Sequence, residues 1–264
     1  MPEEEKKFAI ALPGEWALQK VFGPALTEVG EDLKKLYAKG RDRIIAVAYR
    51  KVSDPDDGQQ ANLRVTRDVL WNGAFTDDEV CAEYFGGILA SSRTPDGKED
   101  DTVQFVDVIK SLSAKQLRLH YVIYNALNKL LVSSGTTVNV GMASELHRNR
   151  VWFSAIELVE VLKLKIETDL NILHRQGLLS GYGTNTHKVD EQRNLPYAHA
   201  DPTTFGVLLY AVAHNRLAEW RMFDRKDFGN FPDIALPSVC ATTLEDLLKK
   251  LGLVETPPPA PASP

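Results

Sequence analysis

Three segments of the chain carry the same signal for the start of a helix. Each has a Ser or Thr followed three positions later by Glu or Gln, with an apolar residue on either side. The segments are 75–80 (FTDDEV), 112–117 (LSAKQL) and 153–158 (FSAIEL). In such a capping box the two polar side chains satisfy free N–H groups of the first turn, and the flanking apolar residues pack together. Helices are therefore predicted to begin at Thr76, Ser113 and Ser154.

The first half of the chain has the apolar spacing of further helices. Leucine and valine recur at positions 26, 29, 33 and 36 after Pro24, and Gly40 is expected to interrupt this helix before Ile44. Residues 54–60 (DPDDGQQ) have the composition of a loop. A second helix is predicted from about 62 to 71, and a short one around Phe105 and Ile109.

The second half has a different rhythm, in which short β-prone runs alternate with helices. Helices are predicted over 114–131, 154–162 and 165–176. The runs 136–141 and 151–153 favour strands, and 178–199 has the pattern of a hairpin. Asp201 is predicted to cap a following helix, with Pro202 in its first position.

This order of elements is that of a winged helix-turn-helix, and an unrelated α+β arrangement is the alternative. The predicted fold class is mainly α, with a helical N-terminal domain followed by a winged-helix-like α+β domain. The predicted boundaries are 1–119 for the helical domain, 120–236 for the winged-helix-like domain, 237–255 for a C-terminal helix and 256–264 for a disordered, proline-rich tail.

Composition excludes several classes of protein. The 264 residues are 44% hydrophobic, and no run reaches the roughly 18 apolar residues of a membrane span. The first ten residues, MPEEEKKFAI, hold acids where a secretory signal has a basic region. Two cysteines are too few for a disulfide framework or a four-cysteine zinc site. We therefore expect a cytoplasmic protein that does not bind membranes.

The sequence contains no motif of a known catalytic or cofactor site. It has no GxSxG, P-loop or GxGxxG pattern. His187 and His199 could face each other across the hairpin, but without a clear carboxylate or thiolate partner they predict no metal site. The acidic runs 77–79 and 99–101 fit a helix start and a solvated loop. No enzymatic activity and no cofactor are expected, and a metal-assisted hydrolase is kept as a third hypothesis.

A winged helix would present the helix 165–176 and the hairpin to its partner. Cations there could contact phosphates, and Asn171 and Arg175 could contact base edges. The candidate partner- or nucleic-acid-binding residues are Lys165, Asn171, His174, Arg175, Lys188 and Arg193. However, residues 120–230 hold 12 basic and 11 acidic residues, whereas a DNA-binding surface is typically strongly basic. The charge therefore favours a protein partner. The sequence gives neither the identity of that partner nor the oligomeric state of this chain.

Three segments together resemble a known family. They are 23–45, 69–92 and 104–123, with a looser similarity over 170–212. They resemble the Abi-alpha family, a bacterial domain of unknown function that is linked by name to abortive infection. The residues that match its pattern are Asp77, Asp78, Glu79, Ile88, Leu89, Ala90, Phe105, Ile109, Leu112 and Ser113. The loop 93–102 departs from the family by lacking a histidine-proline pair, and 136–150 has no counterpart in it.

The resemblance implies a bacterial cytoplasmic protein in antiphage defence, and it supplies no catalytic residues. Together with the charge distribution, it leads to the functional hypothesis. The chain is predicted to be a non-enzymatic protein that acts by protein–protein recognition through helical and winged-helix modules. The alternative is a winged-helix DNA-binding transcriptional regulator.

Overall fold

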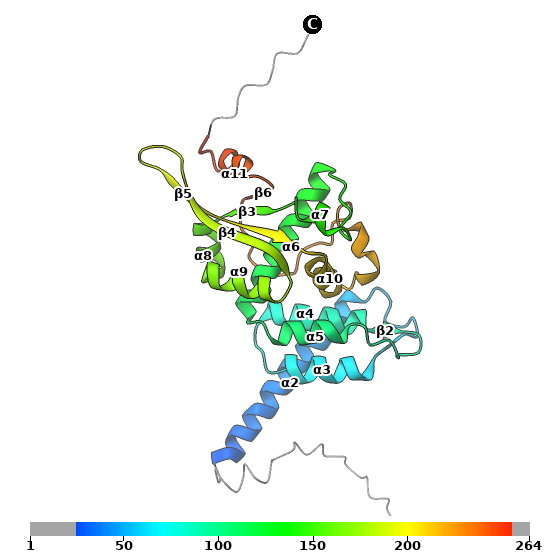
Figure 1. The fold of residues 1–264 in the computed structure, drawn as a ribbon. Helices are drawn as coiled ribbons and strands as arrows, with labels where there is room; N and C mark the ends of the chain where they lie inside the picture. Colours follow the sequence, from blue (N-terminus) through cyan, green and yellow to red (C-terminus); the bar gives the residue numbers. More distant parts are fainter. Residues whose placement is uncertain (1–24, 255–264) are drawn as a thin grey trace, which may run out of the picture.

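The computed structural model describes the backbone of residues 25–254 and the side chains of residues 34–254. The predicted tail, 256–264, lies outside the described residues. The described chain is mainly helical and contains two small antiparallel sheets (Figure 1). Among its helices none is long and apolar enough to cross a lipid bilayer.

Within the described residues, the N-terminal part contains four helices and a two-stranded sheet. The helices are α2 (Ala25–Lys51), α3 (Leu63–Gly73), α4 (Glu79–Ser91) and α5 (Val103–Lys110), and β1 (Gln60–Ala61) pairs with β2 (Arg93–Thr94). Helix α4 is buried along almost its whole length and packs against α2, α3 and α10. Figure 1 shows the N-terminal half of α2 extending beyond the other helices.

Gly40 does not interrupt α2, contrary to the prediction. The helix is continuous through it, and the glycine lies against the end of α3. A Cβ atom at this position would lie 1.9 Å from the carbonyl oxygen of Ala74. Gly40 therefore permits close packing of two segments rather than a break in the helix.

The remainder alternates helices with the strands of one four-stranded sheet. In chain order it contains α6 (Ala114–Ser134), α7 (Ala143–Leu146), β3 (Val151–Ser154), α8 (Ala155–Leu162), α9 (Ile166–Arg175), β4 (Leu179–Lys188), β5 (Asn194–Pro202), α10 (Thr204–Ala213), the 3-10 helix η1 (Leu217–Met222), β6 (Cys240–Ala241) and α11 (Leu244–Lys250). The strand order is β4-β5-β3-β6, with antiparallel pairing throughout. The predicted C-terminal helix is thus confined to α11, and β6 precedes it.

The predicted helix starts have three different outcomes. Ser113 forms the expected reciprocal capping box with Gln116. Ser154 caps α8, but the Glu157 carboxylate accepts a hydrogen bond from the backbone N–H of Ser238 instead of completing a box. Thr76 is wrong as a cap, because the helix begins later and the Asp78 side chain accepts from the N–H of Val80 at 2.9 Å.

Two further predictions in the second half are wrong. Residues 136–141 form no strand, because their backbone bonds to distant side chains instead of a neighbouring strand. The N–H of Val138 donates to Asp224 (3.0 Å), and the carbonyl of Val140 accepts from Thr204 (2.7 Å). Asp201 and Pro202 end β5 rather than starting a helix, and Thr203 caps α10.

One cluster of buried apolar residues extends from Ile44 to Ile234. It therefore crosses the predicted domain boundary at 119/120, which falls within α6. A smaller cluster lies under α11 and includes Leu195, Ala241 and Leu247. Helix α6 supplies a large share of the main core, including the fully buried rings of Tyr121 and Tyr124.

Candidate functional site

A groove of about 520 Å³ lies between α8, the start of α9 and the β4–β5 hairpin. Its lining residues are Ala155, Val159, Lys165, Ile166, Glu167, Thr168, Thr184, Asn185, Thr186, Pro196 and Tyr197. We call this the α9 groove. The described residues that line it include one lysine and one glutamate, so the groove carries no net charge. Most of its remaining surface is apolar or offers hydroxyl groups.

Helix α8 adds exposed apolar surface at the α9 groove. Val159, which lines the groove, is 44% exposed, and Ile156 on the same helix is 50% exposed. The two residues are three positions apart and therefore lie on one face of the helix. Exposed apolar side chains beside a groove are typical of surfaces that bind proteins.

The structure does not bring the six candidate residues into one site. Lys165 lines the α9 groove. Asn171 and His174 instead fasten α9 to β4: Asn171 Nδ2 donates to the Tyr182 hydroxyl (2.8 Å), and His174 Nδ1 lies 2.9 Å from the carbonyl oxygen of Leu179. Arg175 is exposed in the last turn of α9.

The two candidates on the hairpin lie at its far end. Lys188 is the exposed last residue of β4. Arg193 is engaged within its own turn, where its Nε lies 2.6 Å from the carboxylate of Asp190. This ion pair lowers the pKa of Asp190 through the hydrogen bond from Arg193. Arg193 therefore stabilises the turn of the hairpin.

A cluster around Asp201, at the other end of the hairpin, was missed by the sequence prediction. The buried Asp201 carboxylate lies 3.0 Å from Arg150 Nε, 3.4 Å from His199 Nδ1 and 3.7 Å from His147 Nδ1. Burial, followed by the neighbouring Arg150 charge, lowers the pKa of His199 against the opposing effect of Asp201. The sequence separates these residues by up to 54 positions, from His147 to Asp201, so spacing alone could not have revealed them.

The Asp201 cluster lacks the geometry of a catalytic triad or a metal site. The Ser180 hydroxyl lies 3.2 Å from His147 Nδ1, the same nitrogen that faces Asp201. A triad needs the nucleophile and the acid on opposite ring nitrogens. Among the described residues no group of three His, Cys, Asp or Glu side chains could hold a metal ion. His187 and His199 do not face each other, since they pair with Leu195 and Gly183.

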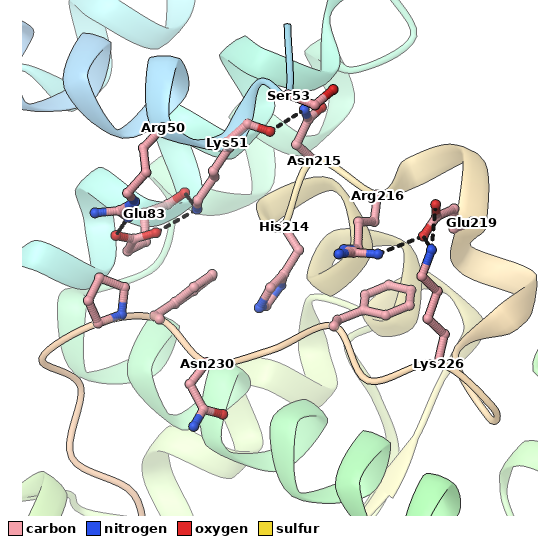
Figure 2. A pocket seen from close by; sticks show the side chains of 13 residues that line it. Arg50, Lys51, Ser53, Glu83, His214, Asn215, Arg216, Glu219, Lys226 and Asn230 are labelled. Atoms are coloured by element: carbon pink, nitrogen blue, oxygen red, sulfur yellow. Dashed lines mark hydrogen bonds and ion pairs between the residues drawn. The ribbon is translucent and has the colours of Figure 1, made fainter.

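A second cavity, of about 530 Å³, lies between the end of α2, the end of α10 and the segment 216–232. We call it the polar pocket (Figure 2). The charged residues that line it are Arg50, Lys51, Glu83, Arg216, Glu219 and Lys226. Four cations and two carboxylates give these described residues an excess of two positive charges.

Glu83 is the buried anion of the polar pocket. Its carboxylate pairs with Arg50 and lies 2.6 Å from Lys51 Nζ. The Lys51 ammonium also donates to the carbonyl oxygens of Glu83 (2.8 Å) and Ala213 (2.7 Å), and thereby joins α2, α4 and α10. Burial lowers the pKa of Lys51 to about 8, although Glu83 opposes this shift.

Glu219 is the exposed counterpart of Glu83 on the opposite side of the pocket. Its carboxylate lies 2.9 Å from Arg216 and 2.8 Å from Lys226. The Arg216 guanidinium also lies 5.7 Å from the centre of the Phe228 ring. Each carboxylate of the pocket thus forms ion pairs with two cations.

His214 lies between the two charged groups (Figure 2). Its ring stacks on Phe231 with centroids 4.4 Å apart, and its Nδ1 lies 2.9 Å from the Tyr210 carbonyl oxygen. The ring also hydrogen-bonds the backbone of Gly229, and its Nε2 is buried. Burial lowers the pKa of His214 to about 3, so the ring is neutral at physiological pH.

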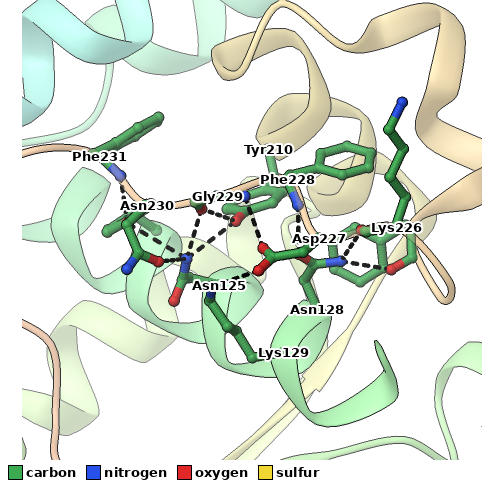
Figure 3. Close-up of polar contacts among 12 residues, drawn as sticks. Asn125, Asn128, Lys129, Tyr210, Lys226, Asp227, Phe228, Gly229, Asn230 and Phe231 are labelled. Carbon is green, nitrogen blue, oxygen red and sulfur yellow. Dashed lines mark hydrogen bonds and ion pairs between the residues drawn. The ribbon is translucent and has the colours of Figure 1, made fainter. Parts of the chain in front are cut away.

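Two asparagines of α6 hold the segment that closes the pocket (Figure 3). Asn128 Nδ2 donates to the carbonyls of Phe223 (2.6 Å) and Lys226 (2.8 Å), and its Oδ1 accepts from the N–H of Phe228 (3.0 Å). Asn125 Nδ2 donates to the carbonyl of Gly229 (3.1 Å). The signal in the sequence is two asparagines, three positions apart, in the otherwise uncharged and largely apolar stretch 121–128 of α6.

The chain was compared with protein-family models, curated proteins and solved structures, and none of them matches it.

Proposed function

We propose that this chain is a non-enzymatic recognition protein that binds a protein partner through a winged-helix module. The proposed module comprises α6 and the elements from β3 to β5. Two short helices, α8 and α9, stand between β3 and β4, and β5 pairs with both strands. This order and pairing support the winged-helix assignment, with α9 in the place of the reading helix and the hairpin as the wing.

The observation that carries the proposal is the neutral, partly apolar lining of the α9 groove. A nucleic-acid surface needs an excess of Lys and Arg to neutralise phosphates. Here Lys165 is offset by Glu167, and Val159 is an exposed apolar wall. Such a surface can bury an apolar side chain of a protein partner and offer hydroxyls at the rim.

DNA is the alternative partner, and it rests on three exposed cations. Lys165, Arg175 and Lys188 have no ion pair to any described residue, and so remain available to phosphates. A transcriptional regulator would use these side chains together with Asn171. The cations lie on the helix and at the hairpin end, so they are separable from the apolar wall by mutation.

Antiphage defence is the proposed biological setting, and the resemblance of the N-terminal half to the Abi-alpha family supports it. The matching residues Ile88, Phe105, Ile109 and Leu112 are buried and hold the helices together. At these positions the resemblance therefore concerns residues that pack the core. Deleting the gene in its bacterial host is expected to change phage plating efficiency, and restoring it is expected to reverse the effect.

The partner is identified by affinity capture of the tagged full-length chain from its native host, with and without phage, at about 150 mM salt. Val159→Glu places a charge on the groove wall and is expected to abolish capture of a stoichiometric protein. Met142→Glu is the matched control, because Met142 is 47% exposed but does not line the groove.

Retention of the same protein by wild type and the Met142 variant, and its loss from the Val159 variant, would support the proposal. Nucleic acid that is released by raised salt and lost in Arg175→Glu, but kept in Val159→Glu, would establish the DNA alternative. Divalent-metal-dependent degradation of nucleic acid would instead establish the hydrolase hypothesis.

A further inference from the structure

We infer that two copies of this chain pair through the N-terminal part of α2 and the exposed rings beside it. This inference goes beyond the proposed partner recognition and concerns a different surface, since the α9 groove is lined by residues between 155 and 197. The surface comprises Leu36 and Tyr37 of α2, Trp71 of α3 and Phe75, which follows α3. We call it the aromatic patch.

The aromatic patch exposes large apolar side chains that lie together. Trp71 is 51% exposed, Phe75 is 49% exposed and Leu36 is 42% exposed. The centre of the Phe75 ring lies 5.4 Å from that of Tyr37 and 6.4 Å from that of Trp71. Adjoining rings at the surface are typical of the centre of a protein interface, where aromatic side chains supply most of the binding energy.

The aromatic patch lies where α2 leaves the body of the protein. Gly40 is buried against Ala74, whereas Leu36 is exposed, although it lies four positions earlier and therefore on the same face of α2. Figure 1 shows the N-terminal half of α2 continuing beyond the other helices. The face of α2 that packs inside the protein thus continues onto a part of the helix that projects from it.

The sequence of this projecting part has the spacing of a seam between two helices. Positions 26, 29, 33 and 36 are apolar, so the steps between them alternate between three and four residues. This alternation is the narrow seam of paired helices, whereas a helix that packs on a globular core has a wider apolar stripe. The spacing therefore favours another helix as the partner.

The charge of α2 indicates that this helix comes from a second copy. Residues 25–33 hold three acidic residues and no basic one, whereas 34–43 hold five basic residues and one acidic residue. In an antiparallel pair the acidic end of each α2 points towards the basic segment of the other, and opposite charges across an interface select the partner and its orientation. Lys39 and Arg43 also pair with Asp77, at 3.5 and 3.7 Å. Asp77 is exposed, and exposed pairs of this kind contribute little.

A two-fold axis lets each copy play both parts at once. The projecting residues 25–33 of one copy cover the aromatic patch of the other, and the reverse contact is identical. Nine helical residues span about 14 Å, which is close to the extent of three rings whose centres lie 5.4 and 6.4 Å apart. One helix segment is therefore long enough to cover one patch.

The test is sedimentation equilibrium of the full-length chain at concentrations from about 1 to 100 μM, in about 150 mM salt. A dimer is expected. Leu36→Lys and Trp71→Ala are each expected to weaken it by at least about tenfold. Ile45→Lys is the matched control for Leu36→Lys, because Ile45 is 44% exposed on the same helix. It lies about two and a half turns further along, and hence on the opposite face, so the dimer is expected to persist.

Two charge-reversed chains test whether the occupant is a second copy. One chain reverses the acids of the projecting part and the other reverses three cations after it: Glu28→Lys, Glu31→Lys and Asp32→Lys in the first, and Lys39→Glu, Arg41→Glu and Arg43→Glu in the second. Neither is expected to dimerise alone, because like charges then face each other along α2. Mixed together, they are expected to form a heterodimer. Circular dichroism establishes that every variant is folded.

Three results would overturn the inference. The first is a monomer at every concentration, and binding of that monomer to vesicles of anionic phospholipid would assign the aromatic patch to a lipid surface instead. The second is a dimer that Ile45→Lys dissociates as readily as Leu36→Lys does. The third is a mixture of the two charge-reversed chains that stays monomeric, since opposite charge on α2 would then not hold the copies together.

Discussion

The α9 groove and the polar pocket use charge in opposite ways. Lys165 lines the groove and has no ion pair to a described residue, and the same holds for the exposed Arg175 at the end of α9 and Lys188 at the end of β4. In the pocket, each of the four cations already forms an ion pair with a carboxylate. One of these two carboxylates, that of Glu83, is buried. Exposed charges contribute little to stability, whereas a buried charge that loses its partner is costly. The comparison separates charges that maintain the fold from charges that are free to meet a partner.

Removing Glu83 is expected to have the largest effect on stability. Glu83→Ala leaves the buried Lys51 ammonium without its counter-ion, although its two carbonyl contacts remain. The expected loss is about 3–5 kcal/mol in the free energy of unfolding, measured by urea denaturation. Glu219→Ala removes the exposed bridging carboxylate and is expected to cost about 1 kcal/mol or less.

The two glutamate variants test whether the halves of the pocket differ in role. Equal costs for Glu83→Ala and Glu219→Ala would contradict the distinction between a buried structural anion and an exposed one. The double variant Glu83→Ala with Lys51→Met tests the same distinction further. Replacing both partners removes the unpaired charge, so the double variant is expected to recover part of the stability that Glu83→Ala loses.

The stability of the protein is expected to fall as the pH is lowered below about 6.5, because two buried histidines resist protonation. Burial lowers the pKa of His120 and of His214 to about 3. The unfolded chain therefore binds a proton at each site before the folded chain does. Each histidine adds about 1.4 kcal/mol per pH unit to the slope between pH 6 and pH 4.

The measurement is the free energy of unfolding by urea at several pH values for the wild type and His214→Phe. The variant keeps a ring against Phe231 but cannot titrate at this position. The slope of its free energy of unfolding against pH is expected to be smaller than that of the wild type by about 1.4 kcal/mol per pH unit, which corresponds to one proton. Parallel curves would mean that the His214 site is protonated in the folded protein as easily as in the unfolded chain. Lys51 titrates near pH 8 and lies outside this range.

Local signals in the sequence predicted the helices well, since their causes lie within a few residues. The starts of α6 and α8 follow from Ser113 and Ser154, whose side chains accept hydrogen bonds from the first turn of each helix. The start of α4 was misplaced because both Thr76 and Asp78 can cap a helix. The capping box pattern considers Thr76 and Glu79 and gives no information about Asp78, which is the observed cap. The strand expected at 136–141 failed because its hydrogen-bond partners, Asp224 and Thr204, are remote in sequence.

Neither the polar pocket nor the Asp201 cluster could be predicted from local patterns. The pocket depends on contacts such as that of Lys51 with Ala213, which are 162 positions apart. Its residues come from three helices and an irregular segment, so no spacing connects them. The candidate residues on α9 were recognised because they share one helix. Their hydrogen bonds, such as that from Asn171 to the Tyr182 hydroxyl, depend on the neighbouring strand β4 and could not be predicted from α9 alone.

The corrected start of α4 predicts different costs for two neighbouring substitutions. Asp78→Ala removes the side chain that caps the helix and pairs with Arg118, and is expected to cost about 1–2 kcal/mol. Thr76→Ala removes a long hydrogen bond of 3.3 Å from the Asp78 N–H and a side-chain contact with the Cys81 thiol, and is expected to cost less than Asp78→Ala. Urea denaturation distinguishes them, and Ser113→Ala, at about 1 kcal/mol, is the reference for a complete box. A larger loss from Thr76→Ala than from Asp78→Ala would restore the original prediction.

The smallest expected effects are those of two exposed arginines, Arg175 in the last turn of α9 and Arg193 in the turn of the β4–β5 hairpin. Arg175→Gln removes a cation that pairs with no described residue, and Arg193→Gln removes one that pairs with Asp190 in a solvent-exposed turn. Thermal midpoints of both variants are expected to match the wild type within error, because solvent screens such charges. The two variants differ in binding only if the partner is anionic. Under the DNA alternative, Arg175→Gln weakens binding more than Arg193→Gln, whose guanidinium is already engaged. Under protein recognition through the groove wall, both variants retain the partner, and only Val159→Glu releases it.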